Sequence, residues 1–365
     1  MKKTYQRIAV KIGSNVLTTA EGLPNTDLMA QLVQQVSQLI HRHKVEVILI
    51  SSGAVAAGRS LIQLNTKENT VTQRQLLASI GQVKLIQVYG ELFKKHRQTC
   101  SQILVTKEDF RDRQHYLNMQ NCFQGLLKYG IIPIVNENDV VSVTELMFTD
   151  NDELAGLVAS MMDVDALFIL TNVNGLYNGH PEEEHTELIR LVDKQKINLN
   201  EIISTKKSGF GRGGMLTKCK NAQKIADLGI AVHIANGHQE NVLIDLYQKA
   251  TSAEELPGTL FLPHPKRPSS IKKWVAHSEG YAKASLIVNE GAKQALLSDK
   301  VTSLLPVGLT EVQGSFQKGD IVKIKDAEGS DIGIGMTKYN DTVTRERIGQ
   351  QGHHPVIHYD HIFLY

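Results

Sequence analysis

The sequence predicts an α/β protein, a mainly parallel sheet sandwiched by helices, followed by a small β-rich domain. Apolar runs typical of buried strands alternate with segments of helical apolar spacing as far as about Gly258, which favours a parallel sheet. The composition then changes to short β-like runs with glycines. At 365 residues the chain exceeds what one hydrophobic core usually supports, so we expect two domains.

The bulk composition is ordinary for a soluble globular protein, with 41% hydrophobic and 21% charged residues. A net charge of +2 gives no reason to expect a nucleic-acid binder or a membrane-surface protein. Cys100, Cys122 and Cys219 are scattered and lack metal-ligand spacing, which suits a reducing compartment. Charged residues interrupt the segment where a signal peptide would be apolar, and no apolar stretch approaches the ~20 residues of a membrane span. We therefore expect a soluble, cytoplasmic protein with no membrane partner.

In the first domain, expected over residues 1–260, strands and helices should alternate. A continuous apolar run indicates a strand buried on both faces. The expected strands are Ile8–Val10, Val45–Ile50, Ile103–Val105, Ile131–Val135, Ala166–Leu170 and Val232–Ala235. The expected helices are Asp27–His41, Thr72–Lys95, Tyr116–Tyr129, Asn151–Met162 and Met215–Leu228.

The rest of the chain is expected to form a linker, a small domain and a tail. Leu262–Ser270 holds three prolines and indicates a linker, assigned to residues 261–276. The β-like runs of the domain expected over residues 277–352 are Ser285–Val288, Ser303–Leu305, Thr310–Gln313, Ile321–Ile324 and Ile332–Met336. Residues 353–365 are expected to be a polar tail. Its histidines, His353, His354, His358 and His361, lack a cysteine partner or a defined ligand spacing, so we favour no metal site there.

Two polar clusters within Ile131–Ala159 suggest a ligand pocket. The first, Asn136–Asp139, follows an apolar run, and the second, Asp150–Glu153, leads into a helix. Ligands of open α/β sheets bind beyond the carboxyl ends of the strands. A turn or a helix cap is the better explanation of one such cluster alone, but two within one unit favour a site.

Three further segments could bind phosphate. The first strand ends in Lys11 and Gly13, a cation beside backbone N–H groups, although a solvated lysine is the simpler explanation. The small residues of Ser51–Arg59 suit either an anion or tight helix packing. The glycine-rich Ser208–Met215, followed by Thr217 and Lys218, suits a triphosphate better than a dinucleotide, or is a flexible loop. The first of these segments does not match the GxxxxGK[ST] P-loop.

Taken together, these motifs resemble the amino-acid kinase family. The segments concerned, within roughly residues 5–260, are VKIGSNVL, SSGAVAAGR, QLLASIGQ, IPIVNENDVV, FTDNDELAG, LTNVNGLY and GRGGMLTK. Residues 280–339 resemble a PUA domain, notably in LLPVGLTEVQGSFQKGDIVKI and IGIGMTKY. The resemblance implies an amino-acid kinase fold followed by a small PUA barrel.

Within the family, the motifs are most similar to those of kinases that phosphorylate the γ-carboxylate of L-glutamate, the first step of proline biosynthesis. The resemblance implies ATP as co-substrate, Mg²⁺, feedback inhibition by proline, and a homo-oligomer, dimer or tetramer. It also implies transfer of the labile product to glutamate-5-semialdehyde dehydrogenase. Two alternatives stay open: a related kinase with another acid acceptor, and RNA binding by the PUA domain. The second is disfavoured because acidic residues interleave the lysines of that domain.

The resemblance also implies roles for individual residues. Lys11 and Lys218 would contact the transferring phosphoryl group, and Asp152 would hold and orient both lysines. The residues implied around glutamate are Ser52, Asn136, Asp139, Asp150 and Asn151. Those implied around ATP are Lys11, Gly13, Thr171, Asn172, Arg212, Gly213, Gly214, Met215, Leu216, Thr217 and Lys218. No residue is assigned as a metal ligand, although Asp150 or Asp152 could help to place Mg²⁺.

Two residues depart from the family pattern, since Asn172 and Arg212 stand where many relatives have Asp and Thr. Both belong to the nucleotide side, so they bear on nucleotide affinity rather than on the reaction. The acceptor carboxylate has an unperturbed pKa of about 4.3 and is ionised at neutral pH. No general base is therefore needed, and catalysis is expected to depend on positioning and positive charge.

Overall fold

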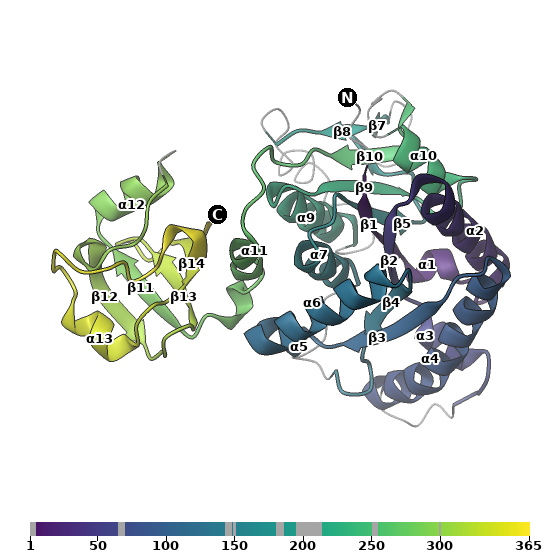
Figure 1. Ribbon diagram of the computed structural model, residues 1–365, viewed down its shortest axis with the longest axis horizontal. Helices are drawn as coiled ribbons and strands as arrows, with labels where there is room; N and C mark the ends of the chain where they lie inside the picture. Colours follow the sequence, from purple (N-terminus) through teal and green to yellow (C-terminus); the bar gives the residue numbers. More distant parts are fainter. Residues whose placement is uncertain are drawn as a thin grey trace. The chain divides into compact units, whose positions relative to one another are not determined.

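The computed structural model describes residues 5–64, 70–142, 148, 151–179, 186–194, 214–249, 255–298 and 301–365. The chain divides into two compact units, Met1–Arg267 (unit 1) and Pro268–Tyr365 (unit 2). Each unit has its own sheet (Figure 1) and its own hydrophobic core. Among the described residues, no helix combines the length and apolarity needed to cross a bilayer.

Unit 1 is built on a sheet of eight described strands in the order β3-β4-β2-β1-β5-β9-β10-β8. Their bounds are β1 Arg7–Ile12, β2 Glu46–Ser51, β3 Cys100–Val105, β4 Ile132–Glu137, β5 Ala166–Thr171, β8 Leu191–Val192, β9 Ala231–Asn236 and β10 Gly258–Phe261. All neighbours pair in parallel except β9 and β10. A separate hairpin pairs β6 (Leu176–Tyr177) with β7 (Leu188–Ile189). The prediction of a mainly parallel sheet is confirmed, with all six expected strands in it.

Helices cover both faces of this sheet (Figure 1). Among the described residues the helices are α1 Ser14–Leu17, α2 Thr26–His43, α3 Ala54–Arg59, α4 Thr70–Lys95, α5 Lys107–Arg111, α6 Arg113–Lys128, α7 Asn151–Met161, α9 Gly214–Asp227 and α10 Val242–Gln248. The five expected helices are present, with ends shifted by at most three residues. The sequence did not indicate α1, α3, α5 and α10 as helices, because each is too short to show two turns of apolar spacing.

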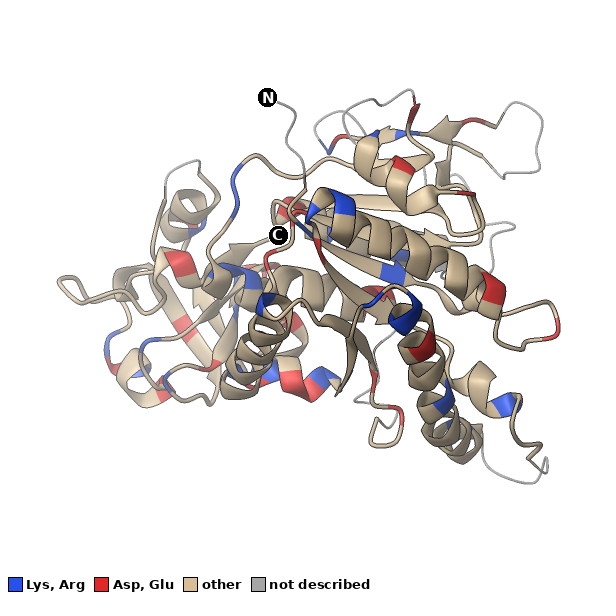
Figure 2. Ribbon diagram, turned by 45° about the vertical axis from the view of Figure 1, so that its right-hand side comes forward, with Lys and Arg blue, Asp and Glu red and all other residues tan. Residues whose placement is uncertain are grey.

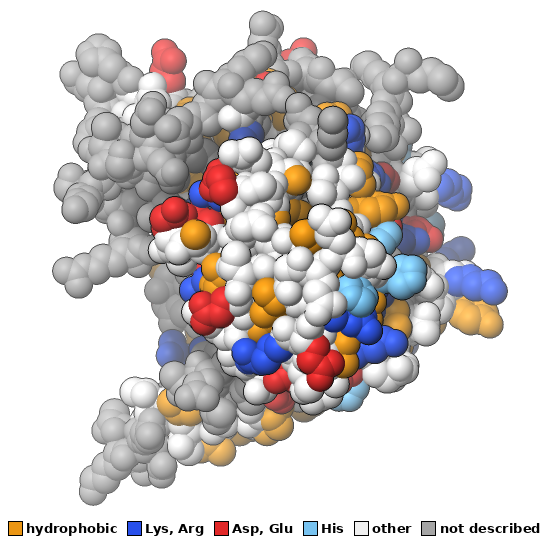
Figure 3. Space-filling view, turned by 90° about the vertical axis from the view of Figure 1, so that its left-hand side faces the viewer, with side chains coloured by type: hydrophobic (Ala, Val, Ile, Leu, Met, Phe, Trp, Pro, Cys, Tyr) orange, Lys and Arg blue, Asp and Glu red, His pale blue; other side chains and the backbone are white. Residues whose placement is uncertain are grey.

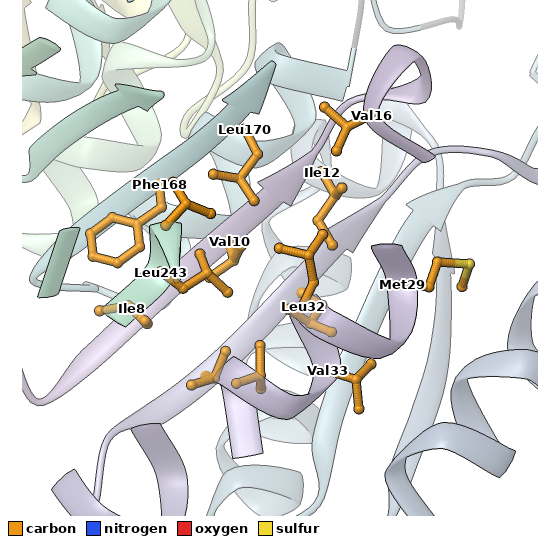
Figure 4. Close-up of a cluster of buried hydrophobic side chains, with 14 of the residues drawn as sticks. Ile8, Val10, Ile12, Val16, Met29, Leu32, Val33, Phe168, Leu170 and Leu243 are labelled. Carbon is orange, nitrogen blue, oxygen red and sulfur yellow. The ribbon is translucent and has the colours of Figure 1, made fainter. Parts of the chain in front are cut away.

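The main core of unit 1 lies between the sheet and α2 (Figure 4). Ile8, Val10 and Ile12 of β1 are buried with Leu32 and Val33 of α2. The start of α2 is fixed by Asn25, whose side chain accepts a hydrogen bond of 3.1 Å from the backbone N–H of Leu28. The helix ends before Lys44, whose backbone adopts the left-handed conformation at φ 57°. This packing fixes β1, whose carboxyl end carries Lys11 and Gly13.

Two glycines let α3 and α4 approach each other closely. A Cβ atom at Gly58 of α3 would overlap the carbonyl oxygen of Leu77, and one at Gly81 of α4 would overlap that of Ala54. The small residues of Ser51–Arg59 therefore serve helix packing at Gly58, one of the two explanations that the sequence left open. The contact also fixes the first turns of α4 beside the carboxyl end of β2.

Unit 2 contains a five-stranded sheet in the order β12-β11-β13-β14-β15 among its described residues. The strands are β11 Ala284–Val288, β12 Leu309–Gly314, β13 Ile321–Lys325, β14 Asp331–Met336 and β15 Ile362–Leu364. The helices are α11 Ser270–Ala276, α12 Glu290–Leu297 and α13 Asp341–Glu346. The expected small β-rich domain is thus confirmed as a separate sheet.

Two boundaries and one strand expected in the second half of the chain differ from the structure. The linker expected over residues 261–276 contains α11, which Ser269 caps, so only residues 262–269 lack a helix or strand. The tail expected over residues 353–365 contains β15, which pairs with β14 because Ile362 is apolar and buried. Residues Ser303–Leu305 form no strand; Leu304 makes an isolated bridge, and Pro306 follows directly.

Candidate active site

Three charged side chains from separate elements meet at the carboxyl end of β1. Lys11 belongs to β1, Asp152 to the first turn of α7, and Lys218 to the start of α9. The Nζ atom of Lys11 lies 2.6 Å from Oδ1 of Asp152, and the Nζ of Lys218 donates to Oδ2 of the same carboxylate. The structure therefore brings the three residues of the predicted catalytic group together around one carboxylate.

The carboxylate of Asp152 is buried, and the Asp152 residue is only 1% exposed. Burial alone would raise the pKa of Asp152, but the ammonium groups of Lys11 and Lys218 outweigh it and hold this pKa below its usual value. Two ammonium groups and one carboxylate carry a formal charge of +1. The cluster is therefore suited to hold an additional anionic group.

A cavity of about 630 Å³, called the large cavity below, opens on one side of this cluster. Four of the residues predicted to surround the acceptor line it: Ser52, Asn136, Asp139 and Asn151. The full lining is Lys11, Ser14, Ser52, Gly53, Ala54, Val55, Ala56, Arg59, Thr70, Gln73, Arg74, Leu77, Asn136, Glu137, Asp139, Phe148, Asn151 and Lys218. The residues come mainly from β1, the segment after β2, α4, the end of β4 and α7, as expected for a site at the carboxyl edge of a sheet.

A second cavity of about 280 Å³, called the small cavity, shares Lys11, Ser14 and Lys218 with the large one. Its other lining residues are Gly13, Asn15, Val16, Thr171, Asn172, Val173 and Met215. Of the residues predicted to contact ATP, it thus includes Lys11, Gly13, Thr171, Asn172, Met215 and Lys218. The two lysines therefore stand at the border between the two cavities.

Hydrogen bonds fix the polar lining of the large cavity. The side-chain amide of Asn151 donates to Ser52 Oγ at 2.8 Å and to Asn136 Oδ1 at 3.3 Å. The amide of Asn136 donates to Gln82 Oε1 at 3.0 Å. Gly53, at φ +105°, makes the turn after Ser52 in a conformation that L side chains rarely adopt. Side chains of the two predicted polar clusters thus contact each other, which a turn and a cap would not require.

Arg74 and Glu137 are site residues that the sequence did not single out. Arg74 Nη2 lies 2.7 Å from Asp139 Oδ1 and 3.3 Å from Glu137 Oε2. Burial and, to a smaller extent, the charge of Asp139 raise the pKa of Glu137, against the opposing effects of the Phe148 amide and Arg74. Glu137 lies inside the quoted NEND cluster, and Arg74 lies one position before QLLASIGQ, but no pattern linked them.

The remaining predicted site residues are located as follows. Asp150, Arg212 and Gly213 lie outside the described residues. Gly214, Met215, Leu216 and Thr217 form the start of α9, and of these Met215 lines the small cavity.

The described residues do not offer a protein-built site for Mg²⁺. They contain no group of three or more His, Cys, Asp or Glu side chains that could hold a metal ion. Both oxygens of Asp152 lie beside lysine ammonium groups, and a divalent cation in the same place is electrostatically disfavoured. We therefore assign no step to a protein-bound metal.

The chain resembles known proteins along its whole length. Residues 6–236 match the sequence model of the amino acid kinase family, and residues 284–354 match that of the PUA domain. A glutamate 5-kinase of Bacteroides thetaiotaomicron is 50% identical over 364 residues, which is 100% of each chain. A glutamate 5-kinase of Chlorobaculum tepidum is 49% identical over 99% of this chain and 98% of its own. One from Thermoanaerobacter sp. is 38% identical, over 95% of this chain and 91% of its own.

Proposed function

Because this chain belongs to the amino acid kinase family, we propose that it transfers the γ-phosphoryl group of ATP to the γ-carboxylate of L-glutamate. The product is L-glutamyl 5-phosphate, the first intermediate of proline biosynthesis. The proposal takes its substrates from the relatives named glutamate 5-kinase and its site from the geometry described above.

One observation carries the proposal: the Lys11–Asp152–Lys218 cluster lies where the large and small cavities meet. A phosphoryl group passing between two anions must cross a region of positive charge, and this border has a formal charge of +1. The large cavity would hold glutamate with its γ-carboxylate near the lysines. The small cavity would hold the phosphates of ATP.

The chemistry requires charge and alignment more than proton transfer. The acceptor carboxylate is already ionised at neutral pH, since its unperturbed pKa is about 4.3. The lysines would neutralise the phosphoryl oxygens as the bond to ADP breaks and the bond to glutamate forms. Asp152 would act as a positioning residue, because it binds both ammonium groups and keeps them from spreading apart.

The nucleotide side has space for an anion next to Lys11. Gly13 lies beside this lysine, and a Cβ atom at Gly13 would stand 3.6 Å from Lys11 Nζ and 3.1 Å from the carbonyl oxygen of Leu170. A side chain here would occupy space that a phosphate oxygen needs. We assign Thr171 and Asn172 to the same nucleotide because both line the small cavity.

We also propose the partners that the resemblance implies. Proline would occupy part of the large cavity and compete with glutamate. Mg²⁺ would arrive with the phosphates of ATP rather than on a protein site, since this ion keeps several waters and binds few carboxylates. The chain would form a homo-oligomer and pass its labile acyl phosphate to glutamate-5-semialdehyde dehydrogenase in the cytoplasm.

The proposed function is tested by trapping the acyl phosphate with hydroxylamine. The purified chain is incubated with ATP, Mg²⁺ and either glutamate, aspartate, acetylglutamate or carbamate. We expect hydroxamate from glutamate alone. Product from another acceptor, and none from glutamate, would assign the chain to a different reaction of the family. Proline added at limiting glutamate should lower the rate.

A second candidate function, RNA binding by unit 2, is suggested by the match to the PUA domain. Unit 2 contains a cavity of about 550 Å³ lined in part by Lys318, Lys338, His354 and His361. Acidic and basic residues nevertheless alternate along the ribbon (Figure 2), and acidic side chains lie among the basic ones on the face shown in Figure 3, without a continuous basic stripe there. A salt-dependent mobility shift with tRNA would support this function, and its absence would leave the kinase reaction alone.

A further inference from the structure

The large cavity has two charged clusters of opposite sign. Lys11, Lys218 and Asp152 form the first, with a formal charge of +1, and these lysines also line the small cavity. Arg74, Glu137 and Asp139 form the second, called the acidic cluster, with two carboxylates against one guanidinium and a formal charge of −1. Glu137 and Asp139 also line a third cavity of about 190 Å³, which the lysines do not line. The clusters therefore lie at different borders of the large cavity.

The carboxylates of the acidic cluster are more enclosed than its guanidinium. The side chains of Glu137 and Asp139 are 4% and 11% exposed, whereas that of Arg74 is 44% exposed. Glu137 is held in place by the backbone N–H of Phe148, which donates to Oε1 at 3.0 Å. Arg74 is thus the member of the cluster that can turn toward a ligand while the carboxylates stay in place.

Arg74 has donors to share with a ligand. It reaches Asp139 through Nε and Nη2, at 3.0 and 2.7 Å, and Glu137 through Nη2. A guanidinium carries five N–H donors arranged to hold a carboxylate by two parallel hydrogen bonds, so this pairing leaves Nη1 outside it. Without ligand, Arg74 neutralises part of the charge of two enclosed carboxylates.

We propose that Arg74 binds the α-carboxylate of the acceptor amino acid while Asp139 binds its α-ammonium group. The inference rests on the proposed function. The ammonium group would supply the positive charge that the acidic cluster lacks, and the α-carboxylate would replace the carboxylates at Arg74. Arg74 then determines specificity, because an acceptor without an α-carboxylate cannot use it.

Arg59 is the rival for this role, because it lines the same cavity from α3. The α-ammonium and α-carboxylate groups are attached to one carbon atom, so the residues that bind them must be neighbours. Arg74 already contacts Asp139, which makes it the neighbour that this geometry requires. We therefore assign the α-carboxylate to Arg74 and no α-carboxylate contact to Arg59.

The test compares glutamate with two fragments of it, using hydroxylamine trapping. 4-Aminobutyrate lacks the α-carboxylate, and glutarate lacks the α-ammonium group; both are measured as competitive inhibitors. R74Q should raise the KM for glutamate by about 10- to 100-fold, the usual loss for a hydrogen bond to a charged group, and leave the KM for ATP unchanged. R74Q should leave the inhibition constant of 4-aminobutyrate within about twofold, because this fragment has no group for Arg74. R74K, which keeps the positive charge but not the two parallel N–H donors of the guanidinium, should recover part of the lost affinity for glutamate.

The matched control is K94Q, because Lys94 is an exposed cation in the last turn of the same helix. It should leave all these constants unchanged. If R74Q weakened the binding of glutamate and of 4-aminobutyrate by the same factor, the inference would be overturned, since Arg74 would then merely hold Asp139 in place. If R59Q raised the KM for glutamate without changing the inhibition constant of 4-aminobutyrate, and R74Q left both constants unchanged, the inference would be overturned in favour of Arg59. A wild-type chain that forms no hydroxamate from glutamate would instead reject the proposed function on which the inference rests.

Discussion

Lys11 and Lys218 bind opposite oxygens of one buried carboxylate, although one comes from the first strand and the other from α9. The carboxylate, that of Asp152, determines the distance between the two ammonium groups.

Removing either lysine should slow phosphoryl transfer. We expect K11A or K218A to lower kcat by roughly 10²- to 10³-fold, comparable to the loss of one preorganised electrostatic donor. Steady-state assays with saturating ATP and glutamate would measure this. The control is K220A, because Lys220 is exposed on the same helix as Lys218. Near-normal turnover in K11A or K218A would refute the assigned roles.

Removing the carboxylate should destabilise the fold as well as the reaction. D152N leaves two ammonium groups side by side, one of them on Lys11, whose side chain is 6% exposed. Loss of one partner of a buried ion pair typically costs about 3–5 kcal/mol of unfolding free energy. Urea unfolding of D152N and of wild type would measure the difference. The double variant K11M/D152N should recover part of the loss, because it removes one of the two unbalanced charges.

The pH dependence of that difference follows from the lowered pKa of Asp152. A carboxylate whose pKa is lower in the folded than in the unfolded state stabilises the fold. This contribution is fully present at any pH above the pKa of the unfolded state, about 3.9, and is lost as the pH falls through the pKa of the folded state. The difference in stability between wild type and D152N should therefore stay constant from about pH 8 to about pH 5. A difference that declines within this range would show that Asp152 is not held ionised by the lysines.

Lys11, Asp152 and Lys218 were predicted as one group through the resemblance of their motifs to the amino-acid kinase family, because the strand and helix pattern alone places each of them only at a strand end or a helix start. The contact between Arg74 and Asp139 was not predictable in this way. It depends on how closely α4 approaches α3, which is set by Gly58 and Gly81 across a helix pair rather than by any local pattern. The strand β15 was not predicted for a related reason. Its apolar run, Ile362–Leu364, is short and follows polar residues, and its partner strand β14 lies elsewhere in the sequence.

Asp139 should contribute to glutamate binding and not to ATP binding. D139N removes the charge that would pair with the α-ammonium group, so we expect the KM for glutamate to rise far more than the KM for ATP. Initial-rate measurements with each substrate varied in turn would show the separation. Equal increases in both constants would place Asp139 outside the glutamate site.

Glu137 should make glutamate binding sensitive to acid. Its pKa is raised by burial, so it gains a proton at a higher pH than an ordinary glutamate does, and the acidic cluster then loses its excess negative charge. The KM for glutamate should therefore rise as the pH falls through the raised pKa of Glu137. In E137Q the side chain at this position carries no charge at any pH. The KM for glutamate of this variant should therefore be high over the whole pH range, without the rise at low pH. A step of the same size in E137Q would assign the titration to another group.

The close approach of α3 and α4 should be as important to the site as any charged residue. A Cβ atom in G81A would overlap the carbonyl oxygen of Ala54, so the two helices must move apart. Inserting an extra methylene into a packed region typically costs about 1–3 kcal/mol, and a clash with backbone cannot be relieved by turning a side chain. Because Arg74 is in the same helix, we expect G81A to lower both the unfolding free energy and the affinity for glutamate.

G90A is the matched control for this prediction, because Gly90 lies in the same helix and a Cβ atom there would meet nothing within 4 Å. Replacing an unhindered glycine in a helix interior by alanine typically stabilises by about 0.5–1 kcal/mol. Urea unfolding should therefore move in opposite directions for G81A and G90A, and only G81A should raise the KM for glutamate. If both substitutions stabilised the chain without affecting KM, the backbone contact between α3 and α4 would not be what positions Arg74.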